Sequence, residues 1–174
     1  MRTMNDHEQD HVDRWLETVE LPGTVDLEVE GIVDRINGIR RRLHRMLDET
    51  LAEFGLTDGE WKVLTHLQLD GPPHRKSVGQ LGKWADLSSG AMTNRIDRLE
   101  QAGFVKRVPD PDDRRGVLVE LTDAGRRAWE ESVNAQAAKE SLVAAALSAA
   151  EKKQLNALLR RLMIEFEKRE QGKK

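Results

Sequence analysis

Residues 87–121 read LSSGAMTNRIDRLEQAGFVKRVPDPDDRRGVLVEL, and this stretch decides the fold of the chain. Its first part places Met92, Ile96 and Leu99 at helical spacing, whereas the residues at its beginning are small and polar. Its second part has two short β-rich runs, residues 104–108 and 117–121, on either side of a Pro, Asp and Gly cluster, which is the composition of a hairpin turn. The stretch therefore predicts a helix with a small polar start, followed by a β-hairpin with two arginines at its tip.

A shorter helix precedes this one at the spacing of a helix-turn-helix. Ser77 and Gln80 form a capping-box pattern, in which the two side chains satisfy free backbone amides at a helix start. The helix closes near Ala85, and the next begins about three residues later, at Ser88 or Ser89. Two helices at this spacing, followed by a charged hairpin, are the element order of a winged helix.

Two helical patterns lie further upstream. Residues 12–19 carry apolar side chains on one helical face and predict a short arm, which a Pro-Gly pair ends. Residues 25–54 predict a long helix with an apolar stripe and a stop at Gly55. The capping-box pattern of Thr57 and Glu60 predicts a third helix from near residue 58, and residues 74–76 leave room for a minimal strand.

Two further helices are expected after the hairpin. Thr122 predicts the cap of a long helix, and Ser148 with Glu151 forms a capping box before the last one. A helix that follows a compact lobe has nothing within that lobe left to cover an apolar stripe, so we expect a second copy of the chain to bury it. The stripe of the last helix consists of Leu155, Leu158, Leu159 and Leu162.

Composition excludes several kinds of site. The 174 residues contain no cysteine, which excludes disulfides, thiolate metal sites and cysteine catalysis within this chain. The acidic start lacks an apolar signal core, and no run approaches the roughly 20 apolar residues of a membrane span. We therefore expect a cytoplasmic protein with no cofactor and no membrane contact.

Charge is distributed unevenly along the chain. The net charge is −3, but residues 1–30 contain nine acidic and two basic residues, whereas residues 71–116 contain nine basic and six acidic ones. The basic excess coincides with the predicted winged helix. A polyanion would therefore bind there rather than over the whole surface.

The physical features of the winged helix fit double-stranded DNA. A helix enters the major groove only if its leading residues are small, and its free N-terminal amides favour phosphate. Thr93 and Asn94 lie off the apolar stripe, where they can face base edges, and Arg75 and Lys76 flank the preceding turn, where phosphate contacts are expected. The alternative from the same residues is an ordinary helical hairpin beside a solvated loop.

The runs LTDGEWKVLTHL and SVGQLGKWADLSSGAMTNRIDRLEQAGFVKRVPDPDDRRGVLVELTDAG resemble the signature of the MarR family of bacterial transcription regulators. The resemblance covers about residues 30–170, and DDRRGVLVELTDAG is its most specific part. It implies a homodimeric winged helix that reads a pseudo-palindromic operator and, in many members, is released by a small ligand. We expect a mainly α fold with a small β-wing, divided into an N-terminal helical arm (1–24), a helical dimerisation region (25–56 and 122–174) and a winged helix DNA-binding lobe (57–121).

The resemblance also implies roles for individual residues. Arg115 stands where the family's wing arginine enters the minor groove, and Asp113 matches the acid that holds that arginine in place. Because Arg114 is also basic, either of the two arginines could be the one that inserts. Ser77 and Gln80 would contact backbone phosphates. Residues at or near the start of the expected recognition helix that we assign to DNA are Ser88, Ser89, Ala91, Thr93, Asn94, Arg95 and Arg98.

The resemblance implies, for many members, an effector ligand near the dimer interface, and Trp15, His44 and Trp61 are the candidate pocket residues. The alternative for Trp15 is that it anchors the arm by packing. The added N-terminal helix with its tryptophan is similar to that of the urate-responsive branch of the family. That branch also carries an acid and an arginine on the helix that begins here near residue 58. Lys62 and Leu69 stand at the corresponding positions, so the sequence predicts a shared arm with different ligand chemistry.

A different class of function is suggested by residues 7–11, HEQDH, which satisfy the zinc-protease pattern H-E-x-x-H. A metal-dependent hydrolase built on this segment is the alternative to a DNA-binding regulator. That chemistry requires a rigid helix beside a cleft and a third ligand. Here the motif lies in a polar terminal segment, so we expect no catalytic or metal site.

Overall fold

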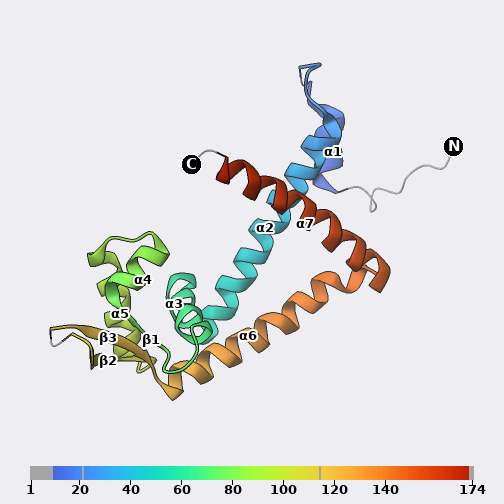
Figure 1. Ribbon diagram of the computed structural model, residues 1–174. Coiled ribbons are helices and arrows are strands. Elements are labelled where there is room, and N and C mark those ends of the chain that lie inside the picture. Colours follow the sequence, from blue (N-terminus) through green and yellow to red (C-terminus); the bar gives the residue numbers. More distant parts are fainter. Residues whose placement is uncertain (1–9, 21, 114, 173–174) are drawn as a thin grey trace. The chain divides into compact units, whose positions relative to one another are not determined.

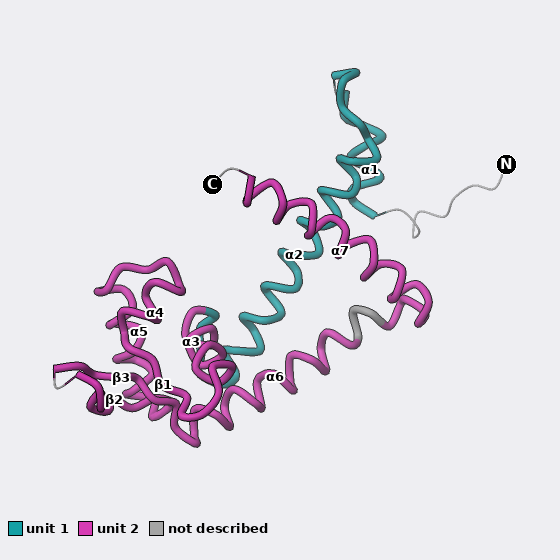
Figure 2. Tube along the Cα trace, in the orientation of Figure 1, with its two compact units in different colours: residues 1–58 teal, residues 59–174 magenta. Residues whose placement is uncertain are grey.

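The computed structural model describes residues 10–20, 22–113 and 115–172, and helices dominate this part of the chain (Figure 1). It divides into two compact units, unit 1 of Met1–Asp58 and unit 2 of Gly59–Lys174 (Figure 2). A small antiparallel sheet lies in unit 2. The expected fold class, mainly α with a small β-wing, is confirmed.

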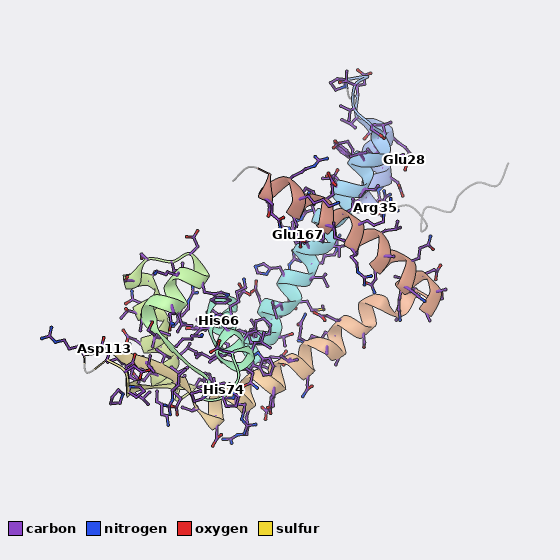
Figure 3. All side chains as sticks on the ribbon, viewed as in Figure 1. Glu28, Arg35, His66, His74, Asp113 and Glu167 are labelled. Carbon is purple, nitrogen blue, oxygen red and sulfur yellow. The ribbon has the colours of Figure 1, made fainter. Side chains whose placement is uncertain are left out.

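Unit 1 contains two helices, α1 (His11–Thr18) and α2 (Leu27–Glu53). Asp10 caps α1 by accepting hydrogen bonds from the backbone amides of Val12 and Asp13 at 2.9 and 3.0 Å. Arg35 of α2, labelled in Figure 3, pairs with the Asp10 carboxylate at 3.0 Å and also with that of Asp13. The Asp13 amide, and after it the Arg35 guanidinium, hold the pKa of Asp10 below its usual value.

The two helices of unit 1 meet at two glycines of α2. A Cβ atom added at Gly31 would lie 3.4 Å from Leu16 Cδ1, and one added at Gly38 would lie 3.6 Å from His11 Cε1. Val12, which lies between His11 and Leu16 in the sequence of α1, is buried and only 1% exposed. The helices therefore run antiparallel, with the start of α1 beside Gly38.

Unit 2 opens with the winged helix. Its helices are α3 (Asp58–Leu69), α4 (Val78–Ala85) and α5 (Ser89–Gln101), and its strands are β1 (Arg75–Ser77), β2 (Val105–Pro109) and β3 (Val117–Leu121). The strands pair antiparallel in the order β1-β3-β2. The lobe has one apolar core, whose fully buried members include Val63, Leu64, Leu67, Leu81, Met92, Ile96, Leu99, Val105 and Val119.

Two strands begin one residue later than the sequence pattern predicts. His74, expected at the start of a strand, has φ 57°, a left-handed conformation that belongs to the preceding turn. Phe104 was expected in β2, but its amide donates to the Leu99 carbonyl at 2.9 Å, and Gly103 before it has φ 76°. Both residues complete turns before their strands start.

The chain continues through α6 (Asp123–Val143), a 3-10 turn (Ala144–Ala146) and α7 (Ala149–Gln171). Thr122 caps α6 as predicted, since its Oγ1 accepts from the Gly125 amide at 3.0 Å. The capping boxes at Ser77 and Ser148 are also confirmed. Within the described residues, no helix combines the length and the apolar character that crossing a membrane requires.

A closed ring of four hydrogen bonds joins α3 to α6. The indole N–H of Trp61 donates to Ser132 Oγ at 2.9 Å, and that hydroxyl donates to the Trp129 carbonyl at 2.8 Å. The indole N–H of Trp129 donates to Thr65 Oγ1, and that hydroxyl donates back to the Trp61 carbonyl, both at 2.9 Å. Each hydroxyl both accepts and donates, so α3 is held to α6 with no indole N–H left unsatisfied.

Candidate nucleic-acid interface

The start of α5 is exposed and small, as the sequence predicts. Ser88 caps the helix by accepting a hydrogen bond from the Ala91 amide at 3.3 Å. Met92, Ile96 and Leu99 face the core and are at most 1% exposed. The surface of the first turns is therefore formed by the exposed residues Ser88, Ser89, Gly90, Ala91, Thr93 and Asn94.

The turn between α4 and α5 is set by local geometry. Asp86 adopts φ 51°, and the Leu87 amide donates to the Gly82 carbonyl at 3.0 Å. At the other end of α4, Gln80 Oε1 accepts from the Ser77 amide at 2.9 Å while Ser77 Oγ accepts from the Gln80 amide at 3.2 Å. Both side chains predicted to contact phosphate thus cap their own helix.

The basic residues of β1 are paired within the lobe. Arg75 pairs with Glu120 of β3, and Lys76 Nζ lies 2.8 Å from Asp70 Oδ1. Glu120 also accepts from Lys106 Nζ at 2.7 Å, and Lys106, followed by Arg75, lowers its pKa. The structure thus places two of the predicted phosphate ligands at the sheet, each beside an acid that balances part of its charge.

Two arginines of α5 lean back toward α3. The guanidinium of Arg95 occupies the space beside Gly59, where an added Cβ would lie 2.5 Å from its Nη2. Arg98 Nε lies 3.0 Å from the Glu60 carboxylate, whose side chain is 4% exposed, whereas the Arg98 side chain is 66% exposed. Arg98 therefore joins α5 to α3 and still presents an open guanidinium edge.

Arg107 joins the wing to the recognition helix, and the sequence reasoning did not single it out. Its Nη2 lies 2.6 Å from Asp97 Oδ1, its Nη1 pairs with Glu100, and its backbone amide donates to Glu100 Oε1 at 3.0 Å. Asp97, followed by Glu100, raises the pKa of Arg107. Two acids three residues apart on a helix, close in sequence to a basic strand, are the signal that could have identified it.

Replacing Arg107 by Ala is expected to destabilise the protein by about 1 to 2 kcal/mol, because it removes charge-assisted bonds and leaves two like charges side by side. Arg107→Lys should recover only part of this, since one ammonium does not reproduce the guanidinium fork. Urea unfolding measures the loss. The matched control is Arg126→Ala, which removes surface pairs to Asp123 and Glu130 at 3.5 and 3.2 Å within one helix. An equally small effect for both variants would contradict a tethering role for Arg107.

The wing tip is shaped by its own acids. Asp110 donates its amide to the Gly116 carbonyl at 3.0 Å, and the Gly116 amide donates to the Asp113 carbonyl at 2.8 Å. A Cβ at Gly116 would lie 2.8 Å from Asp110 Cβ, so the turn requires a glycine there. Asp113, labelled in Figure 3, accepts from the Arg115 backbone amide at 2.9 Å. Arg114 lies outside the described residues.

The candidate ligand residues are distributed over both units. Trp15 of α1 is 39% exposed, and His44 of α2 lies 3.9 Å from Asp48. Trp61 belongs to unit 2, where its indole is engaged with Ser132. Trp61 thus has a packing role that is independent of any ligand.

Residues 7–9 of the HEQDH segment lie outside the described residues. His11, its last member, is the first residue of α1 and lies beside Gly38. Across the part of the chain that the structure describes, no group of three or more His, Asp or Glu side chains is arranged to hold a metal ion.

Comparison with known sequences identifies related transcription regulators. A sequence profile described as MarR family matches residues 56–117. The chain is 32% identical over 139 residues to the HTH-type transcriptional regulator PecS of Dickeya dadantii, covering 79% of this chain and 84% of PecS. It is 30% identical over 130 residues to the HTH-type transcriptional repressor YetL of Bacillus subtilis, covering 72% of this chain and 77% of YetL.

Solved structures share the fold. YusO from Bacillus subtilis matches with a TM-score of 0.71 at 22% identity, over 80% of this chain and 96% of YusO. A MarR mutant from E. coli complexed with operator DNA matches with a TM-score of 0.57 at 30% identity, over 79% of this chain and 99% of that one. The profile match and the extent of the PecS match show that this chain belongs to the MarR family.

Proposed function

We propose that this chain is a transcription regulator that binds double-stranded DNA with sequence specificity, acts as a repressor and catalyses no reaction. The observation that carries the proposal is the start of α5, whose small polar side chains are exposed while its apolar stripe is fully buried. A helix end of this kind fits the major groove. PecS and YetL are named as regulators, which supports the same function here.

The proposed assembly is a homodimer. No residue of α7 is buried, although its large apolar side chains Leu155, Leu158, Leu159, Leu162, Met163, Ile164 and Phe166 are 39–60% exposed. In unit 1, α2 likewise exposes Ile32, Ile36 and Ile39. Stripes of this size are covered by a partner in a soluble protein, and a two-fold dimer presents two reading heads to a pseudo-palindrome.

Within this assembly we assign the arm to residues 1–24, the dimerisation region to residues 25–56 and 122–174, and the DNA-binding lobe to residues 57–121. Thr93 and Asn94 read base edges, the wing arginines enter the minor groove, and the remaining cations and caps contact phosphate. A small ligand near the dimer interface releases the DNA, and the protein acts in the cytoplasm.

The preference of the protein for its operator over scrambled DNA tests the proposed function. Footprinting of the purified protein on genomic DNA identifies the operator, and anisotropy then compares operator with scrambled duplex at fixed salt. Replacing Thr93 or Asn94 by Ala is expected to cost about 1 to 3 kcal/mol of operator affinity while leaving affinity for scrambled DNA nearly intact, because base contacts carry the sequence information.

The matched control for these variants is Ala replacement of Lys76, which should weaken both duplexes equally. If the Thr93 and Asn94 variants lose affinity for both duplexes in proportion, these residues do not contact base edges. Failure of the unaltered protein to prefer any genomic site, together with metal-dependent peptidase activity, would favour the hydrolase instead.

A further inference from the structure

The middle of α2 is strongly basic. Residues 35–46 read RINGIRRRLHRM, with five arginines and no acidic residue. Arg35 is engaged by Asp10 and Asp13 of the α1 cap. The other four, Arg40, Arg41, Arg42 and Arg45, are exposed, and we call them the basic belt.

Within residues 10–20, 22–113 and 115–172, no carboxylate pairs with the belt. In unit 2 the basic residues Arg75, Lys76, Arg98, Lys106 and Arg107 each pair with a carboxylate. Among the described residues, none of the belt arginines lies in an ion pair, and Arg42 donates only to the Gly38 carbonyl, at 3.1 Å. Arg41 and Arg45 are four residues apart on a helix, where two like charges cost about 0.2 to 0.5 kcal/mol. The described part of unit 1 thus gains no charge pairing from them.

Two of the belt arginines, Arg41 and Arg45, lie away from the apolar stripe of α2. At about 100° per residue, Arg41 and Arg45 lie roughly opposite the exposed apolar stripe of α2 that contains Ile36. The arm α1 begins at His11, beside Gly38, and its other contact glycine lies further toward the start of α2. Arg41 and Arg45 therefore lie beyond α1 along α2, and a partner chain on the apolar stripe would leave them open.

We propose that the basic belt is a second DNA-binding surface that contacts the phosphate backbone without reading sequence. The inference rests on the proposed function, since it needs DNA as the partner. Arginine presents a planar fork of donors that matches phosphate and is weakly hydrated. Residues 40–45 extend over about 7.5 Å of helix axis, roughly the rise of two base pairs. An exposed helix face has no walls to enclose a small anion, whereas a polyanion needs none.

The test compares Arg41→Gln/Arg45→Gln with a control that removes equal charge elsewhere, Lys152→Gln/Lys153→Gln at the exposed start of α7. Anisotropy with operator and with scrambled duplex is measured over a series of salt concentrations. The belt variant should lose the same several-fold affinity on both duplexes. Its slope of log affinity against log salt should fall in magnitude by about 1 to 2. Each phosphate contact that is lost lowers the number of counterions that binding releases from the DNA.

One further double variant makes the outcome decisive. Arg41→Lys/Arg45→Lys keeps the charge and should retain the salt slope. The proposal is overturned if the belt variant Arg41→Gln/Arg45→Gln has the same salt slope as the control. It is also overturned if that variant loses affinity for the operator only. Loss of the dimer by sedimentation also overturns it, by making the belt an assembly surface. If the unaltered protein binds every duplex equally, the proposed sequence-specific function fails, while the slope difference still decides whether the belt contacts DNA.

Discussion

Ending the chain after Ala150 is expected to yield a monomer, or an aggregate, that binds a palindromic operator about 10² to 10⁴ times more weakly than the full chain. The truncation removes nearly all of α7, and with it the apolar residues Leu155 to Phe166 that unit 2 leaves exposed. A dimer holds its second reading head at a high effective concentration beside the second half-site. A monomer loses that advantage without losing any contact of its own lobe.

Sedimentation velocity and operator titration measure the two consequences of this truncation separately. The control ends the chain after Gln171, where α7 is complete, and should remain a dimer. The double variant Leu158→Asp/Leu162→Asp retains the helix while placing charge on the stripe, and it should dissociate as well. A well-folded dimer after truncation at Ala150 would show that α7 is not needed for assembly.

Gly125→Ala, at the start of α6, should be among the most destabilising single substitutions in unit 2, at about 3 kcal/mol. A Cβ at this position would overlap the backbone carbonyl oxygen of Phe104, and it would lie 2.8 Å from the Phe104 carbonyl carbon and 2.9 Å from Leu121 Cδ1. Backbone does not yield as a flexible side chain does. The same Phe104 oxygen accepts from the Thr122 amide at 3.1 Å, so relieving the overlap would strain the α6 cap.

Thermal and urea unfolding at one fixed protein concentration test this expectation, because a dimer's apparent stability depends on concentration. Gly90→Ala is the control: nothing lies within 4 Å of its added Cβ, and it replaces glycine within a helix. It should stabilise the fold by about 0.5 to 1 kcal/mol. Equal stability of Gly125→Ala and the unaltered protein would mean that α6 can shift its start without cost.

Local sequence signals predicted most of the element limits. The Ser77 and Ser148 capping boxes and the Thr122 cap are confirmed because a cap is satisfied by atoms three residues away. The apolar spacing of Met92, Ile96 and Leu99 likewise predicted which face of α5 is buried. These features need no distant partner, so the sequence alone carries them.

The sequence by itself determined the order of elements, the exposed polar start of α5 and the family signature. Only the tertiary structure decided which charges are already paired. Arg75 with Glu120, Arg98 with Glu60 and the Trp61–Ser132 bond each join residues more than 35 positions apart. No periodicity encodes such pairs, because they depend on how strands register and helices pack. For the same reason the sequence shows the basic belt only as a run of charge, whereas the structure shows that no described carboxylate pairs with it.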